Sequence, residues 1–239
     1  MKYAIIAAGA GSRLCAEGVE RPKPLVELDG EPMLGRLARI FADCNAESLT
    51  IIVNEQMTAV ADYVRDELAP SLPVALELIV KTTPDSMHSF AEVARSIGSG
   101  KFIVTTVDTI FSPDTFRDYA RAFETDDSCD GMMGVSDYID DEKPLYVAED
   151  HAGIITDFLD DARPGVKYVS AGVYGLRLPE AGDVLADCLA RSIGRMRNYQ
   201  RALVAHGLKL KAFSLGKVID VDHAGDVAKA RALIKEFRK

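Results

Sequence analysis

The chain has 239 residues, of which 48% are hydrophobic, and a formal net charge of −9 from 28 basic and 37 acidic residues. This acidity argues against a basic nucleic-acid surface, and the spacing of the four cysteines fits neither a zinc site nor a disulfide framework. The sequence shows neither the ~20-residue apolar run that spans a bilayer nor a signal peptide before its first predicted strand. We therefore expect one cytoplasmic domain, residues 1–239, that binds no nucleic acid and no membrane.

The first half of the chain alternates apolar strands with amphipathic helices, which is typical of a mainly parallel sheet covered by helices. Strands are predicted at Tyr3–Ala8, Leu49–Asn54, Val74–Val80 and Phe102–Val107. Helices are predicted between and after them at Met33–Asp43, Met57–Leu68, Ser89–Ile97 and Pro113–Phe123. The expected fold class is α/β, with a Rossmann-like mixed sheet flanked by helices.

After about Asp126 the pattern changes to short strands separated by turns that contain Asp and Gly. These strands are predicted at Gly131–Ser136, Leu145–Ala148, Gly153–Phe158 and Val169–Leu176. They indicate a small antiparallel extension over the mouth of the sheet. The remaining predicted elements are helices at Pro179–Leu189 and Arg197–Ala205, strands at Leu208–Phe213 and Val218–Val221, and a last helix from about Ala224.

A glycine-rich loop follows the first strand, and a short basic segment between prolines comes soon after it. Glycine lets the backbone turn sharply and approach a ligand closely, and successive N–H groups there can point at phosphate oxygens. Arg13 adds positive charge, and Lys23 is fixed at low entropic cost by the proline on each side. The pattern predicts a triphosphate site with catalytic residues Arg13 and Lys23, and nucleotide-binding residues Ala7, Ala8, Gly9, Gly11, Ser12 and Arg13.

Two other phosphate-binding loops fit this segment less well. A Rossmann dinucleotide loop needs a third glycine where this chain has Leu14. A Walker loop needs Gly-Lys-Ser or Gly-Lys-Thr, which the segment lacks.

Three motifs in fixed order carry a family resemblance: Gly9-x-Gly11-x-Arg13, then Pro22-Lys23-Pro24-Leu25, then Gly30-x-Pro32-Met33-Leu34. This order resembles the N-terminal signature of sugar-phosphate nucleotidyltransferases, also called NDP-sugar pyrophosphorylases. The resemblance implies the nucleotide-diphospho-sugar transferase fold. It also implies a reaction in which a nucleoside triphosphate and a sugar 1-phosphate give an NDP-sugar and pyrophosphate.

Two regions offer carboxylates for a metal ion. Asp108 directly follows the buried strand Phe102–Val107, and the carboxyl ends of parallel strands are where such sheets bind ligands. Asp222 lies between a short strand and the last helix, and Asp220 stands two residues before it. Asp108 and Asp222 match acidic positions of the family, and Mg²⁺ held by carboxylates and phosphate oxygens suits nucleotidyl transfer. We predict Asp108, Asp222 and Asp220 as magnesium ligands; the other interpretation of Asp222 is a helix N-cap.

The signals for the base and for the acceptor are weaker. Ser86 and Ser89 resemble a serine-rich step of cytidylyltransferase-like branches and are predicted to bind the nucleotide, although either one could simply cap the helix. Gly172 lies in a strand that resembles the family's Gly-x-Tyr strand, and Lys167 could supply the cation of a Glu-Lys-Pro step that this chain lacks. Gly172 and Lys167 are therefore the predicted acceptor-binding residues.

Three alternatives remain open at this point. One is a cytidylyl-type transferase acting on a non-sugar phosphate such as phosphocholine. A second is a non-catalytic nucleotide-binding module that kept the loop and lost the acceptor site. The third is a nicotinamide-dependent oxidoreductase, which the residue at position 14 disfavours.

Overall fold

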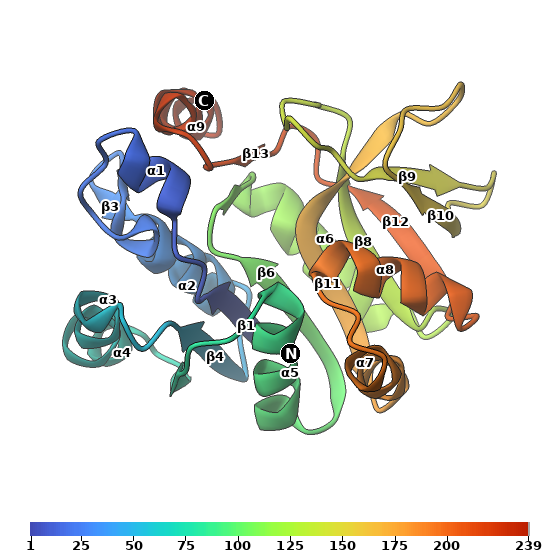
Figure 1. Ribbon diagram of the computed structural model, residues 1–239, viewed down its shortest axis with the longest axis horizontal. Helices are drawn as coiled ribbons and strands as arrows, with labels where there is room; N and C mark the ends of the chain where they lie inside the picture. The colour runs from blue at the N-terminus through green and yellow to red at the C-terminus, as the bar shows by residue number, and fades with distance from the viewer. Residues whose placement is uncertain (239) are drawn as a thin grey trace.

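Four parallel strands form the N-terminal part of the central sheet in the computed structural model, which describes residues 1–238. They are β1 (Lys2–Ala7), β4 (Ser48–Val53), β5 (Ala75–Val80) and β6 (Gly100–Thr106). β1 pairs with β4 on one side and with β6 on the other. Helices cover both faces of β1, which explains why it is a continuous apolar run (Figure 1).

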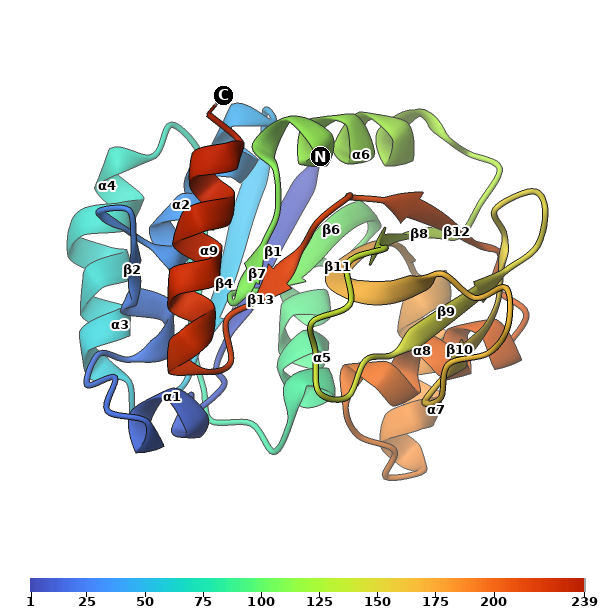
Figure 2. The ribbon, with the colours of Figure 1, turned by 90° about the horizontal axis from the view of Figure 1, so that it is seen from above.

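The C-terminal part of the chain continues this sheet with largely antiparallel strands. They are β8 (Gly131–Ser136), β9 (Tyr146–Glu149), β10 (Ile155–Leu159), β11 (Tyr168–Leu178) and β12 (Leu210–Ser214). The main strand order is β10-β9-β11-β6-β1-β4-β5, with β8 joining β12 to β11. β11 runs antiparallel to β6 and so connects the two parts (Figure 2). The α/β class, the mainly parallel N-terminal half and the antiparallel extension are all confirmed.

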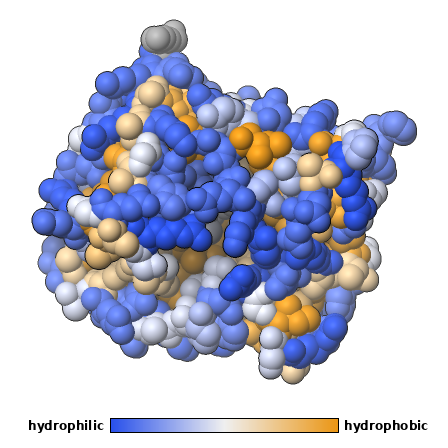
Figure 3. Space-filling view, turned by 45° about the horizontal axis from the view of Figure 1, so that its top comes forward, coloured by the Kyte–Doolittle hydropathy of each residue, from blue (hydrophilic) through white to orange (hydrophobic). Residues whose placement is uncertain are grey.

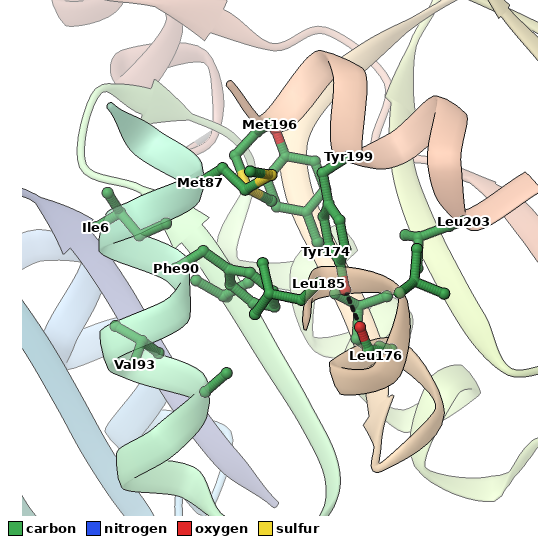
Figure 4. Packing of buried hydrophobic residues seen from close by; sticks show 14 of the residues in the cluster. Ile6, Met87, Phe90, Val93, Tyr174, Leu176, Leu185, Met196, Tyr199 and Leu203 are labelled. Carbon is green, nitrogen blue, oxygen red and sulfur yellow. Dashed lines mark hydrogen bonds between the residues drawn. The ribbon is translucent and has the colours of Figure 1, made fainter. Parts of the chain in front are cut away.

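Side chains alternate between the two faces of β1 and enter two separate hydrophobic clusters. Tyr3, Ile5 and Ala7 pack toward the face covered by α2 (Met33–Asp43), α3 (Thr58–Tyr63) and α6 (Pro113–Thr125). Ala4 and Ile6 face the cluster formed with α5 (Ser86–Ile97), α7 (Glu180–Ala190) and α8 (Met196–Ala205). Figure 4 shows this second cluster, in which the buried Tyr199 hydroxyl donates to the Ala181 carbonyl at 2.6 Å.

Two helices differ from the sequence prediction. The segment predicted as one helix over Met57–Leu68 is α3, a π-helical turn at Val64–Leu68 and the short α4 (Ala69–Ser71). Helix α5 begins three residues earlier than predicted, because the Asp85 carboxylate accepts hydrogen bonds from the Met87 and His88 N–H groups at 2.9 and 3.2 Å. The prediction that Ser86 or Ser89 could cap this helix is wrong.

The last elements of the chain return to the N-terminal loop. Helix α9 (Ala224–Glu236) lies beside α1 (Ser12–Ala16) in both ribbon views (Figures 1 and 2). It follows the short strand β13 (Ile219–Asp220), which pairs antiparallel with β7 (Thr109–Ile110). A second small hairpin joins β2 (Glu27–Leu28) to β3 (Glu31–Pro32). Within residues 1–238 no helix is long and apolar enough to cross a membrane.

Candidate active site

The glycine-rich loop packs directly against Lys23. Gly11 is the N-cap of α1 and has φ +61°. Residues other than glycine rarely adopt this left-handed backbone conformation. A Cβ on Gly11 would stand 2.8 Å from the Lys23 Cβ. Lys23 itself begins a 3₁₀ turn, Lys23–Leu25, whose Pro24 is buried. The loop therefore needs glycine at position 11 both for its turn and for its contact with the lysine.

Lys23 forms ion pairs with carboxylates from two distant parts of the chain. Its Nζ lies 2.5 Å from an Asp108 oxygen and 2.7 Å from an Asp222 oxygen, and its side chain is only 9% exposed. Arg13 approaches the other Asp222 oxygen at 2.9 Å. The structure thus brings together four residues that the sequence analysis selected as catalytic or metal-binding.

Backbone pairing explains why Asp108 and Asp222 converge. Asp108 lies two residues after the end of β6 and directly before β7, and Asp220 of β13 pairs with Thr109 of β7. The Val221 N–H also donates to the Asp108 carbonyl at 3.0 Å. These contacts hold residues that are more than a hundred positions apart in the sequence at the same end of the sheet.

Electrostatics favour the charged forms of this cluster. Burial alone lowers the pKa of Lys23, but the charge of Asp108 and the hydrogen bonds to Asp108 and Asp222 outweigh burial, so the pKa is raised. Burial likewise raises the pKa of Asp222, yet Lys23 and Arg13 outweigh it, and the Asp222 pKa lies below its usual range. The group is thus an ionised lysine between carboxylates.

A cavity of about 540 Å³ opens beside the cluster and the glycine loop. Most of the residues predicted to bind the nucleotide line it, namely Ala8, Gly9, Gly11, Ser12, Arg13, Ser86 and Ser89. Lys23, Asp108 and Asp222 also line it. Ala7 is buried within β1 and is absent from this lining.

The lining of this cavity also contains polar residues that the sequence analysis missed. Asn54, Thr83 and Thr106 line this first cavity. Asn54 directly follows β4, which pairs with β1 in the sheet. Its position at the carboxyl end of a parallel strand could have identified it as a binding residue from the sequence. Ser89 is only 2% exposed and shares a 2.6 Å hydrogen bond with Thr83, so its hydroxyl is already occupied.

A second cavity of about 320 Å³ adjoins the first, and Arg13 and Asp222 line both. Asp220 lines the second cavity, not the first. Asp220 is exposed to this cavity, although its carboxyl group is partly desolvated by the protein around it. Burial and the charge of Asp108 raise the pKa of Asp220 to about 7. The molecular face in Figure 3 is mostly hydrophilic and is hollowed near its centre.

The two residues predicted to bind the acceptor lie elsewhere. Lys167 is on the surface, with its Nζ 3.8 Å from Glu149 and 4.5 Å from the centre of the Tyr168 ring, and it lines neither cavity. Gly172 has φ +67°, and a Cβ there would stand 2.7 Å from the Thr109 hydroxyl oxygen. The absence of a side chain at Gly172 therefore allows β11 to pass close to β7.

The N-terminus of α9 is tied to the end of α1. Glu17, which follows α1, accepts a hydrogen bond from the Ala224 N–H at 2.7 Å and lies 2.6 Å from the His223 ring. The hydrogen bond between the His223 ring and the Glu17 carboxylate raises the pKa of His223. Asp226 accepts from the His223 N–H at 2.9 Å, so His223, and not Asp222, is the N-cap. The Asp222 side chain is therefore free to face Lys23.

The carboxylate pair fits a hard divalent cation that is completed by ligand oxygens. Asp108 and Asp222 already converge on one positive charge, that of the Lys23 ammonium. Mg²⁺ binds through one or two carboxylates plus phosphate oxygens and water. Residues 1–238 contain no group of three or more His, Cys, Asp and Glu side chains placed to hold a metal alone. The phosphates of a substrate would have to supply the remaining ligands.

Two curated proteins are similar to this chain in sequence. The CMP-5′-(3-aminopropyl)phosphonate synthase of Streptomyces rubellomurinus is 25% identical over 165 residues, covering 68% of this chain and 25% of that protein. The UTP–glucose-1-phosphate uridylyltransferase of Haloferax volcanii is 33% identical over 67 residues, covering 28% of each. The chain thus matches about a quarter of the length of these curated relatives.

The fold has counterparts among solved structures. The inositol-1-phosphate CTP transferase from T. maritima superimposes with a TM-score of 0.81 at 20% identity, covering 100% of this chain and 96% of the other. Residues 3–167 match the MobA-like NTP transferase domain, and these residues include the glycine loop, Lys23 and Asp108. The chain belongs to the family of MobA-like NTP transferase domains.

Proposed function

We propose that this protein transfers a nucleotidyl group from a nucleoside triphosphate to the phosphate of a small acceptor and releases pyrophosphate. The observation that carries the proposal is the cluster of Lys23, Asp108 and Asp222, which lines the first cavity and reaches the second through Asp222. One cavity, the donor cavity, would hold the triphosphate against the glycine loop. The other, the acceptor cavity, would hold the molecule that attacks the α-phosphorus.

Each residue then has a defined task. The N–H groups around Gly9 and Gly11 bind the triphosphate, and Arg13 adds a cation at the junction of the cavities. Lys23 bridges the phosphates of donor and acceptor and compensates the charge that they bring together. Mg²⁺ held by Asp108 and Asp222 would neutralise phosphate charge and align the reactants. The acceptor phosphate is already anionic at neutral pH, so no general base is required.

The first acceptor class to test is a sugar 1-phosphate, giving an NDP-sugar. It is supported by the motif order at the N-terminus and by the Haloferax volcanii relative, whose name specifies glucose 1-phosphate. The second candidate is a cytidylyl-type transfer to a non-sugar phosphate or phosphonate. It is supported by the Streptomyces rubellomurinus relative, whose product is a CMP-linked phosphonate, and by the acidic lining of the acceptor cavity.

A substrate grid tests the proposal. We expect pyrophosphate release with Mg²⁺ for at least one pairing of the four common nucleoside triphosphates with a set of phosphorylated sugars, polyols and amino alcohols. Pyrophosphate is the leaving group of the proposed reaction, so it reports turnover for every acceptor. Triphosphate binding without pyrophosphate for any acceptor would instead favour a non-catalytic module, and tight NAD binding would favour an oxidoreductase.

Gly11→Ala should damage both stability and turnover. The left-handed conformation costs a non-glycine residue about 1–2 kcal/mol, and the new Cβ would collide with Lys23 and displace its ammonium. Gly18→Ala is the matched control, because Gly18 has φ +87° and a Cβ added there would meet no atom within 4 Å. Chemical denaturation should show a similar loss for both variants, whereas pyrophosphate release should fall only for Gly11→Ala. Equal activities would refute the contact between the loop and Lys23.

A further inference from the structure

Carboxylates dominate the lining of the acceptor cavity. The basic residues in the lining are Arg13, Lys229 and His223. The six acidic residues in the lining are Asp140, Asp141, Glu142, Asp220, Asp222 and Asp226. An acceptor phosphate entering this cavity brings further negative charge. A ligand that also carries a cation would balance the acidic lining, whereas a neutral polyol would not.

The acids of the cavity are only partly neutralised by the protein. Lys229 pairs with Asp140 at 2.7 Å and with Asp226 at 3.1 Å, and Asp222 is held by Lys23 and Arg13. In residues 1–238, the other three carboxylates, those of Asp141, Glu142 and Asp220, have no Lys or Arg within 4.0 Å, although Glu142 lies 3.7 Å from the His223 ring. The lysine and arginine side chains that line this cavity therefore leave part of its acidic charge without a cationic partner.

Hydrogen-bonding capacity separates a cationic ligand from a sugar. A sugar hydroxyl both donates and accepts, whereas an ammonium group only donates. Both serine hydroxyls in the lining are engaged, since Ser136 donates to the Gly216 carbonyl at 2.8 Å and Ser170 to Gln200 at 2.8 Å, which leaves the Tyr138 hydroxyl. The residues that line the cavity include no Asn, Gln or Thr side chain. The lining is rich in acceptors and poor in free donors, which suits an ammonium group.

The aromatic content of the lining indicates which kind of ammonium group fits. Quaternary ammonium groups are recognised by several aromatic faces. Tyr138 is the one aromatic residue in this lining, and Lys217 already lies over its ring, 4.8 Å from the ring centre. Val169, Ala171 and Ile219 supply an apolar wall for a short alkyl chain. A primary amine with three N–H donors matches these surroundings better than a trimethylammonium group.

We infer that the acceptor is a small aminoalkyl phosphate or phosphonate whose primary ammonium group binds in the acceptor cavity at Asp220. This inference rests on the proposed nucleotidyl transfer. The phosphate or phosphonate end lies at the junction, near Arg13 and Lys23, and one of its oxygens attacks the α-phosphorus. A new P–O–P bond forms, the α–β bond breaks and pyrophosphate leaves, while the ammonium group keeps its protons.

Paired acceptors test the inference. O-phosphoethanolamine is compared with ethyl phosphate, and aminoethylphosphonate with ethylphosphonate, by measuring kcat/KM from pyrophosphate release. The amine of each pair should react about 10- to 100-fold more efficiently, because a charge-assisted hydrogen bond is lost in its analogue. Comparing the two amines distinguishes a phosphate ester from a phosphonate. Phosphocholine or glucose 1-phosphate reacting as well as the better amine would overturn the inference and leave the proposed transfer intact.

Asp220→Asn gives the matching variant test. It should reduce the preference for the amine over its analogue to within a few-fold, mainly through KM, while Asp118→Asn on the exposed surface of α6 should keep the preference. Equal losses for all acceptors, with a higher Mg²⁺ requirement, would instead make Asp220 a metal ligand and overturn the inference. Absence of pyrophosphate release from the wild-type protein with every acceptor would overturn the proposed function itself.

Discussion

Lys23→Met should lower kcat/KM by about 10²- to 10³-fold, the usual cost of removing one positioned donor from a site of developing charge. Methionine keeps much of the length of the side chain but removes the ammonium group that contacts Asp108 and Asp222. Two carboxylates and the phosphates of two substrates would then meet with one fewer positive charge among them. Initial rates of pyrophosphate release at saturating triphosphate, and at several acceptor concentrations, measure the effect.

Arg21→Met is the matched control for this variant. Arg21 belongs to the same basic segment, but its side chain is 62% exposed and pairs with Glu27. Its loss should leave turnover nearly unchanged, since exposed ion pairs contribute little. Thermal unfolding in the presence of Mg²⁺ checks that Lys23→Met remains folded. A folded Lys23→Met protein that turns over at the rate of the wild type would remove Lys23 from the mechanism.

Asp108→Asn should have an effect of similar size by a different route. The change keeps the shape of the side chain and removes the negative charge at the end of β6. If Asp108 and Asp222 together hold Mg²⁺, the variant should need a higher Mg²⁺ concentration and should turn over about 10²-fold or more slowly at saturation. A titration of activity against Mg²⁺, with and without EDTA, measures both quantities.

Asp114→Asn controls for the loss of a carboxylate. Asp114 is in the first turn of α6, 80% exposed and paired with Arg117. This variant should keep the Mg²⁺ dependence of the wild type. The proposed metal role of Asp108 fails if Asp108→Asn and Asp114→Asn give the same titration curve.

The parts of the site that the sequence predicted are those defined by local rules. A buried strand, two glycines and a lysine between prolines specify the loop and Lys23 within a single short segment. Asp108 was predictable because the carboxyl ends of parallel strands share one edge of the sheet. In each case short-range geometry and one topological rule were sufficient.

The parts that the sequence did not predict depend on contacts between distant segments. Lys167 was selected to replace a missing cation, but the register of β11 places it on the surface beside Glu149. Asp220 stays a predicted metal ligand, but its place in the lining of the acceptor cavity, set by the pairing of β13 with β7, was not predicted. Neither result follows from propensity or periodicity, because both depend on strand pairing that a single sequence does not specify.

The ion pair between Lys23 and Asp222 joins residues 199 positions apart. Closing so long a loop carries an entropic penalty that nearby contacts must first offset. The glycine loop and Lys23 are synthesised early, but Asp222 is synthesised only after both parts of the sheet have been translated. A nascent chain therefore carries an incomplete centre, so chemistry at this centre has to wait for the native topology.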